Sequence, residues 1–333
     1  MSDDYLWDGS GEPDPAVERL ERALAPLRSD RPAPELPAAA GRSPFGGMLP
    51  ALAAAAALVF AMSGTWLSPH GRGASWEVTR LERVPAGETV TGVEQLRVGE
   101  WLETGQSSRA RVKVGAIGQV EIEPRTRLRL VDAGAASHRL ALARGVLHAR
   151  IWAPPGRFFV DTPSAVAVDL GCEYTLAVDE TGAGLLRVSS GWVGFEHGGR
   201  ESFVPRGAAC ATRPGEGPGT PYYEGAPAEL KRALAEVDFG PAAARPEAVR
   251  SALASARRED ALSLWHLLAR LDGADRAAVY GRLAQLVAPP DGVTREGVLA
   301  GNRRMLDRWW EALGLGAAGW WRHWLTHLPS DAS

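Results

Sequence analysis

The sequence predicts a multi-domain protein with a single transmembrane helix, an all-β domain and an all-α C-terminal domain. Three observations predict this fold class. Residues 48–67 form an apolar run without a charged side chain, residues 76–212 alternate apolar and polar residues, and residues 228–328 repeat apolar residues at helical spacing. A chain of 333 residues is long enough for two or three domains.

The composition is that of a folded protein and excludes several classes. The hydrophobic fraction is 45% and the charged fraction 23%, both ordinary values for globular domains. The chain has 37 Lys and Arg against 40 Asp and Glu, so there is no basic excess and we expect no nucleic-acid partner. With 2 cysteines it is not a disulfide-dense small domain.

Residues 1–47 are expected to be a tail with one amphipathic helix over 14–28, followed by a Pro- and Ala-rich linker. Asp14 is a suitable N-cap and Pro15 a suitable first helical residue. The apolar side chains fall on one stripe, formed by Val17, Leu20, Leu24 and Leu27. This stripe is a candidate partner-binding surface for another protein, a second copy or the membrane surface. The alternative is a loosely ordered tail.

The run at 48–67 (MLPALAAAAALVFAMSGTWL) is predicted to be a transmembrane helix. Twenty helical residues reach ~30 Å, the thickness of the hydrocarbon core. A cleavable signal peptide and a buried Ala-rich helix are the alternatives. Arginines on the two flanks are equal in number, so charge leaves the orientation open. Both cysteines follow the span, which favours an oxidising compartment there. We therefore expect the N-terminus in the cytoplasm.

Residues 76–212 are predicted to form an all-β domain, either a roll, a sandwich or a short solenoid of many short strands. Ala110, Val112 and Val114 alternate with basic residues, and Val120 and Ile122 alternate with acidic residues. Such a period of two gives one buried and one solvated face. Residues 115–118 (GAIG) separate the two runs as a hairpin turn, so the opposite charges on the outer faces should pair across the strands.

The ordered motifs of this region resemble the FecR domain family. The matching segments are VGEWLETG at 98–105, the alternating pair at 109–122, LARGVL at 142–147, FFVDTP at 158–163, DLGCEY at 169–174 and VSSGWV at 188–193. The resemblance implies the periplasmic part of a single-span regulator in the bacterial inner membrane. It also implies a cytoplasmic partner such as a sigma factor.

Cys172 and Cys210 are a candidate disulfide, because both fall in the β domain. The bond would form if their strands are neighbours and their Cα atoms lie ~4.4–6.8 Å apart. The alternative is a pair of buried thiols.

Residues 213–227 are rich in Pro and Gly and are expected to link the β domain to a helical domain over 228–328. Thr294 is an expected N-cap within it. Trp309 and Trp310 belong to one apolar helical face, and we expect one of this adjacent pair to lie nearer the surface. The tryptophans of this region either fill a helical core or form a face for a membrane or partner.

No catalytic motif is found, and we expect no enzyme activity, cofactor or metal site. The sequence contains no phosphate-binding loop, no His-Glu-x-x-His and no Gly-x-Ser-x-Gly. Asp161, Asp169 and Glu173 could approach one another, but carboxylates on alternating strands are usually solvent-facing. The expected function is relay of an envelope signal to a cytoplasmic regulator. The alternative is a structural envelope protein whose β domain binds peptidoglycan, another glycan or another envelope component, such as a protein, without signalling.

Overall fold

The computed structural model describes residues 75–83, 89–134 and 137–316. The predicted tail helix at 14–28 and the predicted span at 48–67 lie outside these residues. No helix in the described ranges is both long enough and apolar enough to cross a membrane.

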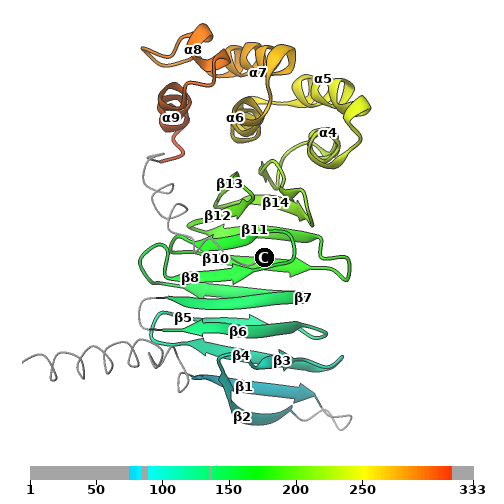
Figure 1. Ribbon diagram of the computed structural model, residues 1–333, viewed down its shortest axis with the longest axis vertical. Helices are drawn as coiled ribbons and strands as arrows, with labels where there is room; N and C mark the ends of the chain where they lie inside the picture. The colour runs from blue at the N-terminus through cyan, green and yellow to red at the C-terminus, as the bar shows by residue number, and fades with distance from the viewer. Residues whose placement is uncertain (1–74, 84–88, 135–136, 317–333) are drawn as a thin grey trace, which may run out of the picture. The chain divides into compact units, whose positions relative to one another are not determined.

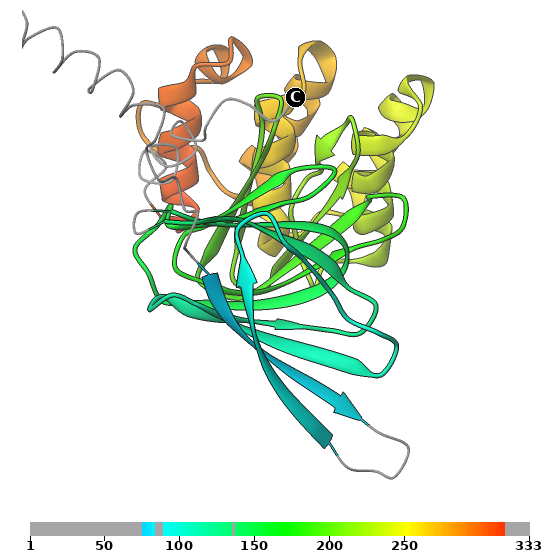
Figure 2. The ribbon, with the colours of Figure 1, turned by 60° about the horizontal axis from the view of Figure 1, so that its bottom comes forward.

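The β domain is a sheet of sixteen strands within the described residues, folded into two layers that share one strand (Figure 2). The first layer has the order β2-β1-β4-β5-β7-β10-β11-β14, with two short strands, β15 and β16, on the outer side of β14. Its strands are β1 (Ser75–Arg83), β2 (Thr89–Arg97), β4 (Ser108–Val114), β5 (Gly118–Ile122), β10 (Glu173–Val178), β11 (Gly184–Ser190), β14 (Ala208–Arg213), β15 (Gly217–Pro218) and β16 (Tyr222–Tyr223).

The second layer has the order β3-β6-β7-β8-β9-β12-β13. Its strands are β3 (Trp101–Glu103), β6 (Arg127–Ala133), β8 (Phe158–Asp161), β9 (Val166–Asp169), β12 (Trp192–His197) and β13 (Arg200–Pro205). Neighbouring strands are antiparallel in both layers, except that β7 and β8 run parallel. The buried faces of the two layers contribute to one continuous hydrophobic core.

The shared strand is β7 (His138–Ile151), whose first half pairs with β6 and β8 and whose second half pairs with β5 and β10. Gly145 stands where the strand changes layer and has φ +98°. A side chain there would collide with Thr126, and the left-handed region disfavours residues with a Cβ, so glycine is required at this position.

The expected β4–β5 hairpin is present, and alternate residues of β4 are buried. The predicted charge pairing across it is also present, because Arg111 lies 2.9 Å from Glu121 and Arg109 lies 2.9 Å from Glu123. These pairs are partly exposed, so each contributes at most ~1 kcal/mol. The register is set by the apolar alternation, because a slip of one residue would turn the buried faces of β4 and β5 toward solvent.

The C-terminal part is helical and packs against the β13 and β14 end of the sheet (Figure 1). Its helices are α4 (Ala228–Phe239), α5 (Arg245–Ser255), α6 (Ala261–Arg270), α7 (Gly273–Leu286), α8 (Arg295–Leu299) and α9 (Arg303–Ala312). Thr294 caps α8 as expected, since its side chain accepts a hydrogen bond from the Gly297 N–H. Residues 213–227, expected as a linker, carry β15 and β16 and are partly buried against β14.

Helix α6 is the centre of the helical part, and residues 261–268 are all buried. Its position between the sheet and helices α7 and α9 explains this burial. Ser263 donates to the Pro221 carbonyl at 2.7 Å, and the Trp265 indole donates to the Leu306 carbonyl of α9 at 2.8 Å. The burial of α6 therefore joins the helices to the β domain.

Trp309 and Trp310 are both fully buried, so the expectation that one lies near the surface is wrong. The reason is that α9 is covered on two sides. Trp309 packs edge-on against Tyr280 of α7, whereas Trp310 packs against Trp265 of α6 and Phe203 of β13. These two tryptophans support the alternative in which the tryptophans fill a helical core. Trp320, Trp321 and Trp324 lie outside the described residues.

Candidate functional site: an arginine-lined cavity

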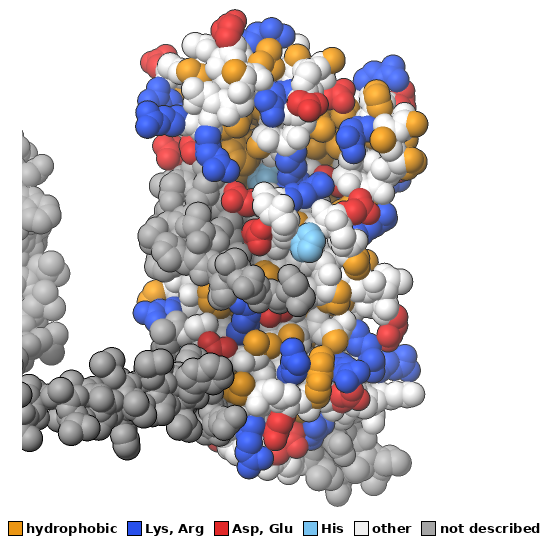
Figure 3. Space-filling model, viewed as in Figure 1, with side chains coloured by type: hydrophobic (Ala, Val, Ile, Leu, Met, Phe, Trp, Pro, Cys, Tyr) orange, Lys and Arg blue, Asp and Glu red, His pale blue; other side chains and the backbone are white. Residues whose placement is uncertain are grey.

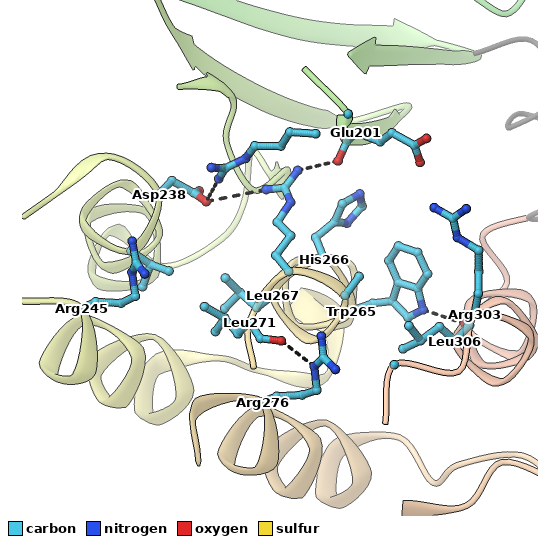
Figure 4. Close-up of a pocket in the computed structure, with 16 residues that line it drawn as sticks. Glu201, Asp238, Arg245, Trp265, His266, Leu267, Leu271, Arg276, Arg303 and Leu306 are labelled. Carbon is cyan, nitrogen blue, oxygen red and sulfur yellow. Dashed lines mark hydrogen bonds and ion pairs between the residues drawn. The ribbon is translucent and has the colours of Figure 1, made fainter. Parts of the chain in front are cut away.

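A cavity of about 560 Å³ lies where the β12–β13 turn meets the helices (Figure 4). This volume is within the usual range of small-molecule sites. Its walls come from the start of β13, the end of α4, the C-terminal half of α6 and the first turns of α5, α7 and α9. The space-filling view shows Lys and Arg side chains spread over the helices and the nearest strands (Figure 3).

Asp238, near the end of α4, is the buried carboxylate of this cavity, with its side chain 4% exposed. Its Oδ1 accepts from Arg200 of β13 at 2.6 Å and lies 3.6 Å from Arg270 of α6. The backbone N–H of Thr220 donates to Oδ2 at 2.5 Å, and the Thr220 hydroxyl donates to Oδ1. One carboxylate thus holds two arginines and a loop, which meets the requirement that a buried charge be paired and hydrogen-bonded.

Arg270 extends from the end of α6 to the sheet. Its Nη2 donates to the Glu201 carbonyl at 2.6 Å and to the Ser202 hydroxyl, and its Nη1 donates to the Thr220 hydroxyl at 3.1 Å. Burial lowers the pKa of Arg270 to about 10, while the charge of Asp238 acts in the opposite direction. Arg270 is therefore still protonated at neutral pH and serves to fasten α6 to β13.

His266 lies beside Arg270 and is not available for proton transfer in this arrangement. Its Nε2 accepts from the Phe203 backbone N–H at 3.1 Å, which requires a lone pair there. The proton then lies on Nδ1, which donates to the Leu262 carbonyl at 2.9 Å. Both ring nitrogens are used in joining α6 to β13, so His266 is a structural residue.

Three further arginines line the cavity, and none of them has a carboxylate partner among the described residues. Arg276 of α7 donates to the carbonyls of Leu271 and Leu299 and is held in place by them. Arg245 and Arg303 are the first residues of α5 and α9, and both are exposed. Within the described part of the chain, neither takes part in a hydrogen bond or ion pair. In the close-up they extend from helices on opposite sides of α6 (Figure 4).

The cavity therefore has a positive lining with an apolar wall. Five arginines face two carboxylates, Asp238 and Glu201, which leaves a formal excess of three positive charges. The apolar wall is made by Val237, Trp265, Leu267, Leu271 and Leu306. This combination suits an anion with an apolar body better than a neutral or cationic ligand.

The disulfide prediction for Cys172 and Cys210 is wrong, since both are free and buried. In register, Cys210 of β14 faces Leu186 of β11, and Leu186 faces Leu176 of β10. Two strand spacings, ~10 Å in all, therefore separate the two positions before any offset along the strands is counted. A disulfide needs Cα atoms closer than ~7 Å.

The three carboxylates considered for glycoside chemistry do not form a site. Asp161 is paired with Arg139 at 2.6 Å, and Glu173 is paired with Arg150 at 2.8 Å. Asp169 is buried instead of solvent-facing, because β9 is covered on both faces at this point.

The surroundings of Asp169 are unusual for an acid. The Cys172 thiol donates to its Oδ2 at 2.6 Å, and the Gly171 N–H donates to its Oδ1 at 2.7 Å. Burial raises the pKa of Asp169 to about 7, against the lowering effect of these hydrogen bonds. Burial also raises the pKa of the Cys172 thiol, so the cysteine is an unreactive donor.

The stripe of Val17, Leu20, Leu24 and Leu27 lies outside the described residues. The described residues contain no group of three or more His, Cys, Asp or Glu side chains placed to hold a metal. Sequence reasoning missed the arginine-lined cavity, because its arginines come from β13, α5, α6, α7 and α9 and have no common spacing. A single arginine at the start of a helix carries no signal that it faces a cavity.

Residues 100–194 match the family model described as FecR protein. No curated protein matches the chain. Two crystal structures of a candidate anti-sigma factor from Parabacteroides distasonis ATCC 8503 are similar to part of it, at 14% identity. The matched region is 41% of this chain and 65% and 64% of the two solved chains, so this chain spans a little under two thirds of their length. The TM-scores are 0.33 and 0.34. The match to the FecR model at residues 100–194 spans strands from both layers of the β domain and agrees with the resemblance that the sequence motifs indicated.

Proposed function

We propose that this chain is a non-enzymatic, single-span regulator that relays an envelope signal to a cytoplasmic partner, with a sigma factor as the favoured partner. The observation that carries the proposal is the FecR match at 100–194. The charge-free run at 48–67 supports a membrane span between the tail and the β domain. In this proposal the β domain and the helices lie in the periplasm.

The helix expected at 14–28 is the proposed contact with the regulator. An amphipathic helix binds proteins by laying its apolar face into a groove. Burial of each leucine would contribute roughly 1.5–3 kcal/mol, so Leu20 and Leu24 together can offset the cost of ordering a short helix. The polar face mixes Glu18 and Glu21 with arginines, which favours a protein partner over an anionic membrane surface.

The test is the double variant Leu20→Asp with Leu24→Asp in the full-length protein. We expect it to lose the sigma factor that co-purifies with the wild type from detergent, and to lose control of that factor's transcription. The matched control is Glu18→Gln with Glu21→Gln, which changes the polar face and should retain the partner. Unchanged co-purification of the sigma factor with the leucine variant would contradict the proposal.

The proposed topology has its own test. Alkaline phosphatase is active only after export, so a fusion after Ser333 should be active and a fusion after Arg28 inactive. The reverse pattern would place the β domain in the cytoplasm and exclude an envelope signal.

A second candidate function is glycan binding without signalling, and one observation favours it. Trp152 is 63% exposed, an unusual position for so large an apolar side chain. Its indole donates to the Ala116 carbonyl at 3.1 Å, which holds the ring beside a cavity of about 230 Å³. Polar side chains of β1, β4 and β5 line the same cavity, among them Glu77, Arg111 and Gln119.

Sedimentation with peptidoglycan tests this second function. Trp152→Ala should lower the bound fraction, because it removes the exposed ring. Trp101→Ala is the matched control, since Trp101 is also exposed but has Arg127 over its ring at 4.3 Å. Equal binding by the wild type and by Trp152→Ala would remove the observation on which glycan binding depends.

A further inference from the structure

We propose that the arginine-lined cavity is a binding site for a small organic anion that carries two or more negative charges, as carboxylate or phosphate, on an apolar body. This inference concerns the described residues alone and does not depend on the relay to a cytoplasmic partner.

Three of the five arginines are held by other groups of the described structure and two are not, so the cavity retains positive charge for a ligand. Arg200 and Arg270 share Asp238, and Arg276 is fixed by two backbone carbonyls. Arg245 and Arg303 remain exposed at the edge of the same cavity, with no hydrogen bond or ion pair inside the described ranges. Two free guanidinium groups beside three anchored ones attract anions, and a planar guanidinium matches a carboxylate or phosphate in two-point contact.

Arg200 adds a second observation that points to a ligand. Its Nη2 is bound to Asp238, but its Nε is buried and has no hydrogen-bond partner among the described residues. A buried N–H without a partner costs roughly 1–3 kcal/mol, and such groups usually call for an explanation. An anion bound against Arg200 could provide the missing acceptor.

The apolar wall selects the rest of the ligand. The Trp265 indole donates to the Leu306 carbonyl, which leaves the ring system in a fixed orientation beside Leu306 (Figure 4). A fixed aromatic wall binds a flat apolar group without ordering cost. We therefore expect an apolar acid to bind more tightly than a bare inorganic anion, and a neutral analogue to bind poorly.

The experiment is calorimetric titration of the full-length protein in detergent with four probes. Phenyl phosphate and phthalate are dianions with a ring, inorganic phosphate lacks the ring, and phenol lacks the charge. Binding of phenyl phosphate or phthalate at least tenfold tighter than both inorganic phosphate and phenol supports the site, and the tighter of the two assigns the acid group. Absence of binding for both ring dianions, or binding equal to that of phenol, overturns it.

The variant Arg303→Ala localises the binding. Loss of one hydrogen-bonded charge should weaken the ring dianion roughly ten- to hundredfold, and Arg245→Ala combined with it should weaken binding further. Arg304→Ala is the matched control, since Arg304 is the next residue of α9, is also exposed and does not line the cavity. Equal weakening by both single variants would indicate a general charge effect and contradict the proposal.

A folding control completes the test. Arg303 is exposed and unpaired in the described structure, so its removal should leave the unfolding midpoint unchanged. Arg303→Lys retains the charge but not the planar fork. It should bind the ring dianion with an affinity between those of Arg303→Ala and the wild type, and affinity equal to that of the wild type would overturn the role of the planar guanidinium.

Discussion

The Asp238 carboxylate of α4 accepts a hydrogen bond from the Arg200 guanidinium of β13 at 2.6 Å, and this ion pair crosses from the helices to the sheet. The pair is largely buried on the aspartate side, so its loss would leave Arg200 and Arg270 close together without a counter-charge. We expect Asp238→Ala to lower the free energy of unfolding by about 3–5 kcal/mol, measured by urea denaturation.

The control for Asp238 is Glu229→Ala on the same helix. Glu229 forms a solvent-exposed ion pair with Arg232, so its removal should leave the denaturation midpoint nearly unchanged. If the two variants unfold at the same urea concentration, Asp238 does not join the helices to the sheet as described.

Asp169 should make the protein less stable as the pH rises. Burial raises its pKa in the folded state to about 7, whereas an unfolded aspartate titrates near ~4. Between these values the folded state binds more protons than the unfolded state, so the free energy of unfolding falls as pH increases from about 4 to about 7. The total fall is on the order of 4 kcal/mol.

The measurement is urea denaturation at several pH values for the wild type and Asp169→Asn. The neutral amide cannot ionise, so the variant should lose this part of the pH dependence and be more stable than the wild type above pH 7. Glu180→Gln, in the exposed turn after β10, should retain the wild-type profile. Identical profiles for the wild type and Asp169→Asn would contradict the assignment.

Gly191 should tolerate alanine far less well than Gly198, although both have positive φ values of +71° and +56°. A Cβ on Gly191 would collide with the Gly171 carbonyl oxygen, whereas a Cβ on Gly198 would meet nothing within 4 Å. Gly198→Ala should therefore cost about 1 kcal/mol for its backbone conformation. Gly191→Ala should cost roughly 1–3 kcal/mol more, because the chain must move. Thermal unfolding of the two variants checks the difference, and equal melting temperatures would contradict it.

Trp310→Ala should lower the free energy of unfolding by about 3–5 kcal/mol. The side chain is fully buried, and its ring lies 4.7 Å from that of Trp265 and 5.4 Å from that of Phe203, measured between centroids. The variant leaves a cavity between α9, α6 and β13. Chemical denaturation gives the value, and a loss below ~1 kcal/mol would mean that α9 is not anchored through this residue.

Local patterns predicted the elements whose residues interact mainly with their sequence neighbours. The β4–β5 hairpin is an example, since its turn, its alternation and its charge pairing all lie within residues 108–123. The N-cap at Thr294 is another, because it needs only the N–H of Gly297. In such cases the partner is a few residues away and the spacing alone identifies it.

Residues 138–151 show where local sequence patterns no longer predict the structure. Gly145 interrupts the alternation of apolar and polar residues in this segment, but the structure has a single strand that passes from one layer to the other. The apparent break arises because the buried face changes at Gly145. The backbone is extended in both halves. That they form one continuous strand is visible only from the strands with which they pair in the two layers.

By itself, the sequence determined the order of a β domain and a helical domain and the FecR character of residues 100–194, because these follow from periodicity and ordered local motifs. The tertiary structure alone decided that Cys172 and Cys210 are kept apart by an intervening strand and that Asp169 is buried. It also decided that arginines from five separate elements line one cavity. The physical reason is range: hydrophobic periodicity acts over a few residues, whereas strand order and charge clustering depend on packing between segments far apart in the chain.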